Sequence, residues 1–127
     1  MGVNAARIEV AMAAVDSARA SLESETRKAR RDIEVAIQEL RASSRTVDAR
    51  LLSIRSAASR VEATEAAYSV GSGDIVEVLN AKESLIAAER DYTKARHAHV
   101  LNQLRLDQAM GDLSESRLVE LESVLIP

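Results

Sequence analysis

The sequence predicts an all-α protein, a long antiparallel coiled-coil helical hairpin with unequal arms and a short C-terminal helix. Three observations favour this fold. The 127 residues are 46% hydrophobic but only 2% aromatic, a composition that suits closely packed helices better than sheets. Residues 3–70 contain neither glycine nor proline, so no turn is expected there. Finally, apolar residues recur with the spacing of a coiled coil.

The first helix is expected at about residues 5–69, with Asn4 as its N-cap. A column of mostly apolar residues runs every seven positions: Met12, Arg19, Thr26, Ile33, Leu40, Val47, Ile54, Val61 and Tyr68. A companion column begins with Ile8, Val15 and Leu22, and we expect it to slip by one place into Ile37, Ser44, Leu51, Ala58 and Glu65. This sustained repeat is typical of a coiled coil.

A turn is expected at residues 70–74, where Gly71 and Gly73 permit a tight reversal. Asp74 and Glu77 have the spacing of a capping box and predict the start of a second helix at about residues 75–110. Gly111 is suited to end that helix. A short helix at about residues 115–121 is then expected to follow, so that residues 1–127 form a single hairpin domain.

The second helix carries two seven-residue columns of its own. One column is Val78, Leu85, Tyr92, His99, Leu106 and Leu113, and the other is Ala81, Ala88, Ala95, Asn102 and Ala109. If the chain folds back at Gly71, facing residues have numbers that add up to about 142 or 143, and large side chains then face small ones. This arrangement predicts Val61 against Ala81, for example.

Several apolar residues have no partner within this hairpin. Ile8, Met12, Val15 and Leu22 lie beyond the expected reach of the second helix, which also has apolar residues outside its two columns, such as Leu79 and Ile86. Exposed stripes of this kind indicate an interface. We therefore interpret the chain as a fragment of a larger assembly, and we expect it to self-associate when isolated.

No combination of residues predicts catalysis, a cofactor or a metal site, so the protein is not expected to be an enzyme. There is no cysteine, and the two histidines, His97 and His99, would point about 200° apart on a helix. His99 is expected to form a hydrogen bond in the core, opposite Ser44, and Asn102 to fix the helix register opposite Leu40. The net charge of −3 gives no indication of nucleic-acid binding.

The residues around the turn resemble a known family. Residues 67–71 read Ala-Tyr-Ser-Val-Gly and residues 74–81 read Asp-Ile-Val-Glu-Val-Leu-Asn-Ala. Together with residues 101–104 and 109–114, they are similar to the C-terminal repeat of TolC-like outer-membrane efflux and type I secretion channels. The resemblance implies the periplasmic part of an outer-membrane protein in a Gram-negative envelope, where long helices of a trimer form an α-barrel for transport.

The resemblance also implies that the tip of the hairpin docks a periplasmic adaptor, or membrane fusion protein, and through it an inner-membrane pump. The predicted adaptor-binding residues are Tyr68, Ser69, Val70, Gly71, Ser72, Gly73 and Asp74. Family members often carry an arginine that helps to close the tip at the position of Gly73. The alternative is a structural coiled-coil hairpin that acts as a scaffold or as an adaptor, for which arms of similar length and one apolar stripe per arm are expected.

Overall fold

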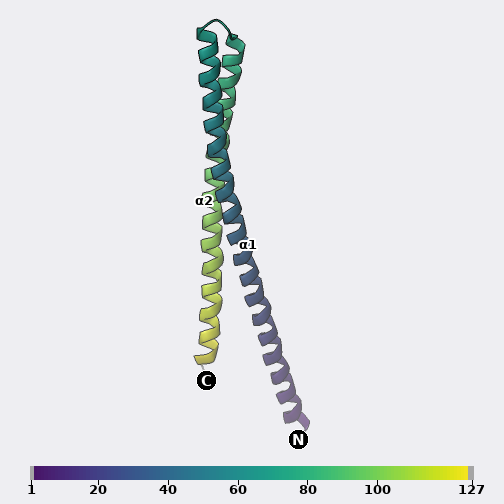
Figure 1. Cartoon of the computed structure of the whole chain (residues 1–127). Helices are drawn as coiled ribbons and strands as arrows, with labels where there is room; N and C mark the ends of the chain where they lie inside the picture. The colour runs from purple at the N-terminus through teal and green to yellow at the C-terminus, as the bar shows by residue number, and fades with distance from the viewer. Residues whose placement is uncertain (1, 126–127) are drawn as a thin grey trace. The chain divides into compact units, whose positions relative to one another are not determined.

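Two long helices joined by a short turn make up the computed structural model of the chain (Figure 1). Helix α1 spans Gly2–Ser69 and helix α2 spans Ile75–Leu125. The structure describes the backbone of residues 2–125 and the side chains of residues 2–111, 115, 119 and 122. Over this part of the chain there is no strand. The predicted all-α hairpin is confirmed, with arms of 68 and 51 residues.

The helix ends differ from the prediction at two places. Helix α1 already includes Asn4, which is therefore not its N-cap. Helix α2 continues through Gly111 to Leu125, so the predicted end at residue 110 and the separate helix at 115–121 are wrong. A glycine inside a helix costs only about 1 kcal/mol relative to alanine, and Gly111 keeps a negative φ. The side chains of Leu113, in the first α2 column, and of Ser114, the expected cap of the short third helix, lie outside the described residues.

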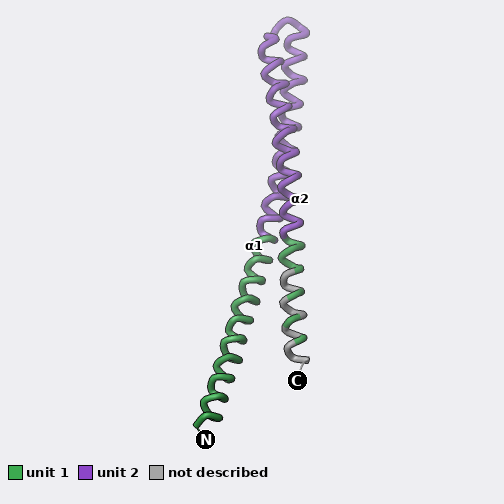
Figure 2. The backbone as a smooth tube through the Cα atoms, turned by 180° about the vertical axis from the view of Figure 1, so that it is seen from behind, with its two compact units in different colours: residues 1–36, 106–127 green, residues 37–105 purple. Residues whose placement is uncertain are grey.

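The helices divide into two compact units, which Figure 2 shows in different colours. Unit 2, residues 37–105, contains the turn and the adjoining parts of both helices. Unit 1 combines residues 1–36 of the first helix with residues 106–127.

In unit 2, the side of α2 that faces α1 is the one that the sequence predicts. Both α2 columns are buried or half-buried throughout this unit: Val78, Leu85, Tyr92 and His99 in one, and Ala81, Ala88, Ala95 and Asn102 in the other. Ala81 has no exposed surface at all. Small residues at these positions let two helices approach closely, so the seam between them is narrow and contains few bulky side chains.

The α1 side of the seam confirms one predicted column and corrects the other. In unit 2 the first column is half-buried from Leu40 to Val61. Of the predicted slipped column, Ile37 and Ala58 are half-buried, but Ser44, Leu51 and Glu65 are exposed. Three residues of the unslipped heptad, Ser43, Ala57 and Thr64, are half-buried instead. Supercoiled helices keep the 3.5-residue repeat without drift, so burial mostly follows the unbroken heptad. At one heptad neither candidate is covered, because Arg50 and Leu51 are both exposed.

Unit 1 contains a long stretch of helix with no buried side chain. Every residue from Gly2 to Ser21 is exposed. Its large apolar residues, Val3, Ile8, Val10, Met12 and Val15, are between 50% and 70% exposed. Burial in α1 begins at Leu22. Further along, Ile33 and Ala109, which the sequence pairs with each other, are both half-buried.

Candidate functional site: the tip of the hairpin

The turn at the tip is closed by backbone hydrogen bonds to the last turn of α1. The amide of Gly71 donates to the carbonyl of Tyr68 at 3.1 Å, and the amide of Ser72 donates to the carbonyl of Ala67 at 2.9 Å. This pair of bonds is the Schellman motif, which requires a residue with positive φ just beyond the helix. Gly71 supplies it, with a φ of 78°.

The carbonyl of Ala67 accepts two further bonds. The amide of Gly73 donates to it at 3.0 Å and the hydroxyl of Ser72 at 3.1 Å. Three donors thus converge on one oxygen at the end of α1. Because all of them come from residues 72 and 73, this carbonyl fixes the course of the chain between the two glycines.

Asp74 begins α2 as the sequence predicts. Its side-chain oxygen Oδ1 accepts a hydrogen bond from the amide of Val76 at 3.2 Å, and its carbonyl accepts one from the amide of Glu77 at 3.1 Å. The reciprocal bond of a capping box, in which the Asp74 amide donates to the Glu77 carboxylate, is not formed between these two residues. Glu77 still lies in the first turn of α2, where a negative charge is favourable.

The tip presents small and apolar groups to solvent. Val70 is 77% exposed and Tyr68 is 50% exposed. Of the seven residues predicted for adaptor binding, all are exposed except Gly73, which is half-buried. The turn therefore brings these residues together on one small surface, and their role in binding an adaptor stays a prediction.

Gly73 faces the end of α1 rather than solvent. A Cβ atom built on Gly73 would lie 3.0 Å from the Cβ of Ala67, 3.1 Å from its carbonyl carbon and 3.1 Å from the amide nitrogen of Tyr68. A Cβ on Gly71 would meet nothing within 4 Å. The two turn glycines thus differ in this chain: Gly71 supplies a positive φ, and Gly73 lies where a Cβ would be crowded by α1. The sequence predicts glycines in the turn, but it does not distinguish these roles.

The polar residues of the seam form hydrogen bonds between the helices. Nδ1 of His99 lies 2.9 Å from the hydroxyl oxygen of Ser43, so the predicted hydrogen bond is present but its partner is Ser43 and not Ser44. The side-chain amide of Asn102 donates to the carbonyl of Glu39 at 3.4 Å, one residue from the predicted Leu40. Within the described part of the chain, no three His, Asp or Glu side chains gather closely enough to hold a metal ion.

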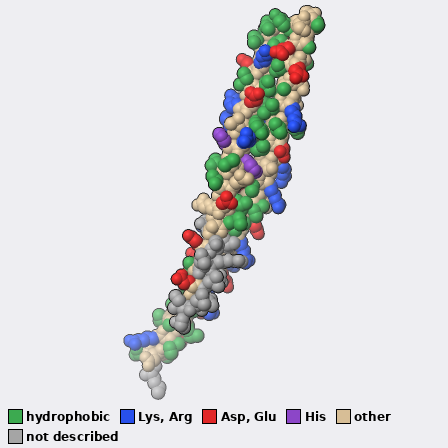
Figure 3. Space-filling view, turned by 90° about the vertical axis from the view of Figure 1, so that its left-hand side faces the viewer, with side chains coloured by type: hydrophobic (Ala, Val, Ile, Leu, Met, Phe, Trp, Pro, Cys, Tyr) green, Lys and Arg blue, Asp and Glu red, His purple; other side chains and the backbone are tan. Residues whose placement is uncertain are grey.

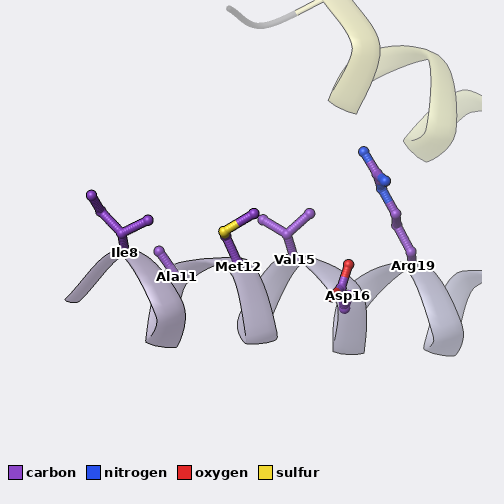
Figure 4. A pocket seen from close by; sticks show the side chains of 6 residues that line it. All are labelled: Ile8, Ala11, Met12, Val15, Asp16 and Arg19. Atoms are coloured by element: carbon purple, nitrogen blue, oxygen red, sulfur yellow. The ribbon is translucent and has the colours of Figure 1, made fainter. Parts of the chain in front are cut away.

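An apolar strip lies on the exposed stretch of α1. Figure 4 shows the side chains of Ile8, Met12 and Val15 pointing to the same side of the helix. The strip ends at Arg19 and is an open hollow rather than an enclosed cavity. Its residues continue the heptad columns that are buried further along α1, so this surface has the form of a coiled-coil seam without a partner.

Helix α2 has a second apolar side in unit 2. Six large residues outside the seam are between 51% and 65% exposed: Val76, Leu79, Ile86, Val100, Leu101 and Leu104. Figure 3 shows apolar side chains reaching the surface between charged ones. A helix with two apolar sides is typical of an element with more than one neighbour.

Neither α1 nor α2, over the described residues, contains a stretch long and apolar enough to cross a membrane.

The fold and the tip define a long antiparallel coiled-coil hairpin with a glycine turn and with apolar sides left open on both helices. Residues 1–112 match the family model for outer membrane efflux proteins. The chain belongs to this family, and its helical hairpin corresponds to the periplasmic part of an outer-membrane protein.

Three curated relatives are similar to the chain. It is 36% identical over 104 residues to outer membrane protein TolC of Salmonella enteritidis and 35% identical over 104 residues to that of Escherichia coli K12; each match covers 82% of the chain. It is 34% identical to TolC of Vibrio cholerae in an alignment 108 residues long, which covers 76% of the chain. The matches cover 21% of the first two relatives and 25% of the third, so the chain spans about a fifth to a quarter of their length.

Proposed function

We propose that the chain forms part of the periplasmic α-barrel of a trimeric outer-membrane export channel, which serves multidrug efflux or type I protein secretion. The match to the outer membrane efflux family over residues 1–112 is the observation that carries this proposal. A transport role of this kind involves no catalysis and no cofactor.

The exposed apolar surfaces support assembly into a barrel. The second apolar side of α2, which includes Leu79, Ile86 and Val100, gives this helix a surface for a neighbouring helix in addition to α1. The strip of Ile8, Met12 and Val15 offers α1 a further partner. A free-standing scaffold hairpin is expected to have one apolar stripe per arm and arms of similar length.

The tip is proposed to dock a periplasmic adaptor, and through it an inner-membrane pump. Among the side chains that the structure describes, Val70 is the most exposed large apolar residue, and no side chain at Gly71 stands between the turn backbone and a partner. A surface of so few residues gives weak binding by itself. Several tips in one channel would raise the overall affinity through multivalency.

Export by the full-length channel carrying Val70→Asp tests the docking proposal. A charge at the centre of the tip is expected to reduce export at least about tenfold, since an unpaired charge in a docked interface costs more than 1.4 kcal/mol. Val70→Thr, which keeps the shape without the charge, is the matched control and is expected to export almost normally. The amount of each variant in the outer membrane is measured by immunoblot.

Normal export by Val70→Asp, at normal abundance, would show that the tip is only a connecting loop. The scaffold function would then be the better account of this hairpin.

A further inference from the structure

We infer that Gly73 positions the tip surface by letting the turn pack against the end of α1. The functional consequence of this inference rests on the proposed docking role, whereas its structural basis does not. Three distances support this inference. A Cβ atom at residue 73 would lie between 3.0 and 3.1 Å from two atoms of Ala67 and from the amide nitrogen of Tyr68.

The atoms of α1 that would contact a side chain at residue 73 cannot easily move away from it. Two of the three crowded atoms belong to the backbone of α1, which is held by the hydrogen bonds of the helix. A side chain at residue 73 therefore displaces the turn rather than the helix. The φ angle is not the cause, because the positive φ in this turn belongs to Gly71.

Displacement of residue 73 affects the bonds that hold the tip together. The amides of Ser72 and Gly73 both donate to the carbonyl of Ala67, at 2.9 and 3.0 Å. If residue 73 moves away from α1, these donors move with it. Val70 and Gly71, which lie between the helix end and Ser72, then lose their fixed position at the outer end of the hairpin.

Amide hydrogen exchange of the 127-residue chain, measured by NMR, tests this inference. Gly73→Ala is expected to speed exchange at residues 72 and 73 by roughly tenfold, because local opening of this turn becomes easier. Gly71→Asn is the matched control, since asparagine tolerates a positive φ and its Cβ meets open space. It is expected to leave these rates within about threefold of the parent chain. Far-UV circular dichroism checks that both variants stay helical.

A second variant identifies the crowded neighbour. In the background of Ala67→Gly, which removes one of the three close atoms, Gly73→Ala is expected to speed exchange less than it does in the parent chain. Unchanged exchange in Gly73→Ala, or an equal effect of Gly71→Asn, would overturn the inference. Neither result depends on an adaptor. Loss of export in Val70→Asp with unchanged exchange in Gly73→Ala would support docking but refute the role of Gly73.

Discussion

Two stretches of α1 carry the same kind of apolar repeat but differ in burial. In unit 2, the column of Leu40, Val47 and Ile54 is half-buried against α2. In unit 1, Ile8, Met12 and Val15 belong to the two columns of the same heptad repeat, yet each is at least half exposed. The repeat in the sequence specifies which side of a helix is to be covered. It does not specify that the covering helix belongs to the same chain.

The largest expected effect tests this difference in burial directly. Ile54→Asp places a charge in the seam and is expected to lower the free energy of unfolding by about 3 kcal/mol, through lost apolar burial and desolvation of the carboxylate. Met12→Asp makes the same kind of change on an exposed side chain and is expected to cost less than about 0.5 kcal/mol. Urea unfolding followed by circular dichroism, at low protein concentration, measures both. An equal loss in the two variants would mean that the N-terminal stretch is covered in solution.

A smaller effect is expected from overfilling the seam. Ala81 is fully buried, so Ala81→Leu has no space for three added carbon atoms and is expected to cost about 1–3 kcal/mol. Ala98 lies on the same helix but is exposed, and Ala98→Leu serves as the control with little expected change. Thermal unfolding compares the two melting temperatures. If Ala81→Leu melts no lower than Ala98→Leu, the helices are not as close as the seam requires.

The smallest effect concerns the register of the seam. Ser43→Ala removes the hydrogen bond with His99 and is expected to cost about 0.5–1.5 kcal/mol. Ser44→Ala, one residue along on an exposed position, is expected to be almost neutral. Parallel urea titrations of the two variants separate the observed register from the slipped one. A larger loss in Ser44→Ala would restore the slipped column.

The sequence predicts best where a local rule and the packing agree. The α2 columns are correct because Ala81, Ala88 and Ala95 alternate with larger residues at a constant spacing. The α1 companion column is only partly correct: Ile37 and Ala58 are half-buried as predicted, but the apolar Leu51 is exposed. The size of a side chain therefore does not decide by itself which residues face the seam. The low helix propensity of Gly111 has only a small energetic cost, so the helix continues through this residue.

The tip also combines features that the sequence predicts with one that it does not. The turn and its Asp74 cap follow from the identity of the residues, since glycine and aspartate have specific backbone preferences. The crowding of Gly73 by Ala67 does not follow from the sequence. It depends on three-dimensional contact between residues on either side of the turn, and no spacing rule reports it.

The sequence separation of the contacts between the two helices indicates the order in which the hairpin forms. Contacts near the turn join residues close in sequence, such as the ion pair of Glu65 and Lys82 at 2.7 Å. Farther away the separation grows, to 56 residues for Ser43 with His99 and 63 for Glu39 with Asn102. Closing a short loop loses the least conformational entropy. We therefore expect the two helices to pair first at the turn and then progressively farther from it. The hydrogen bonds to the Ala67 carbonyl, which close the turn, are therefore expected to form early in folding.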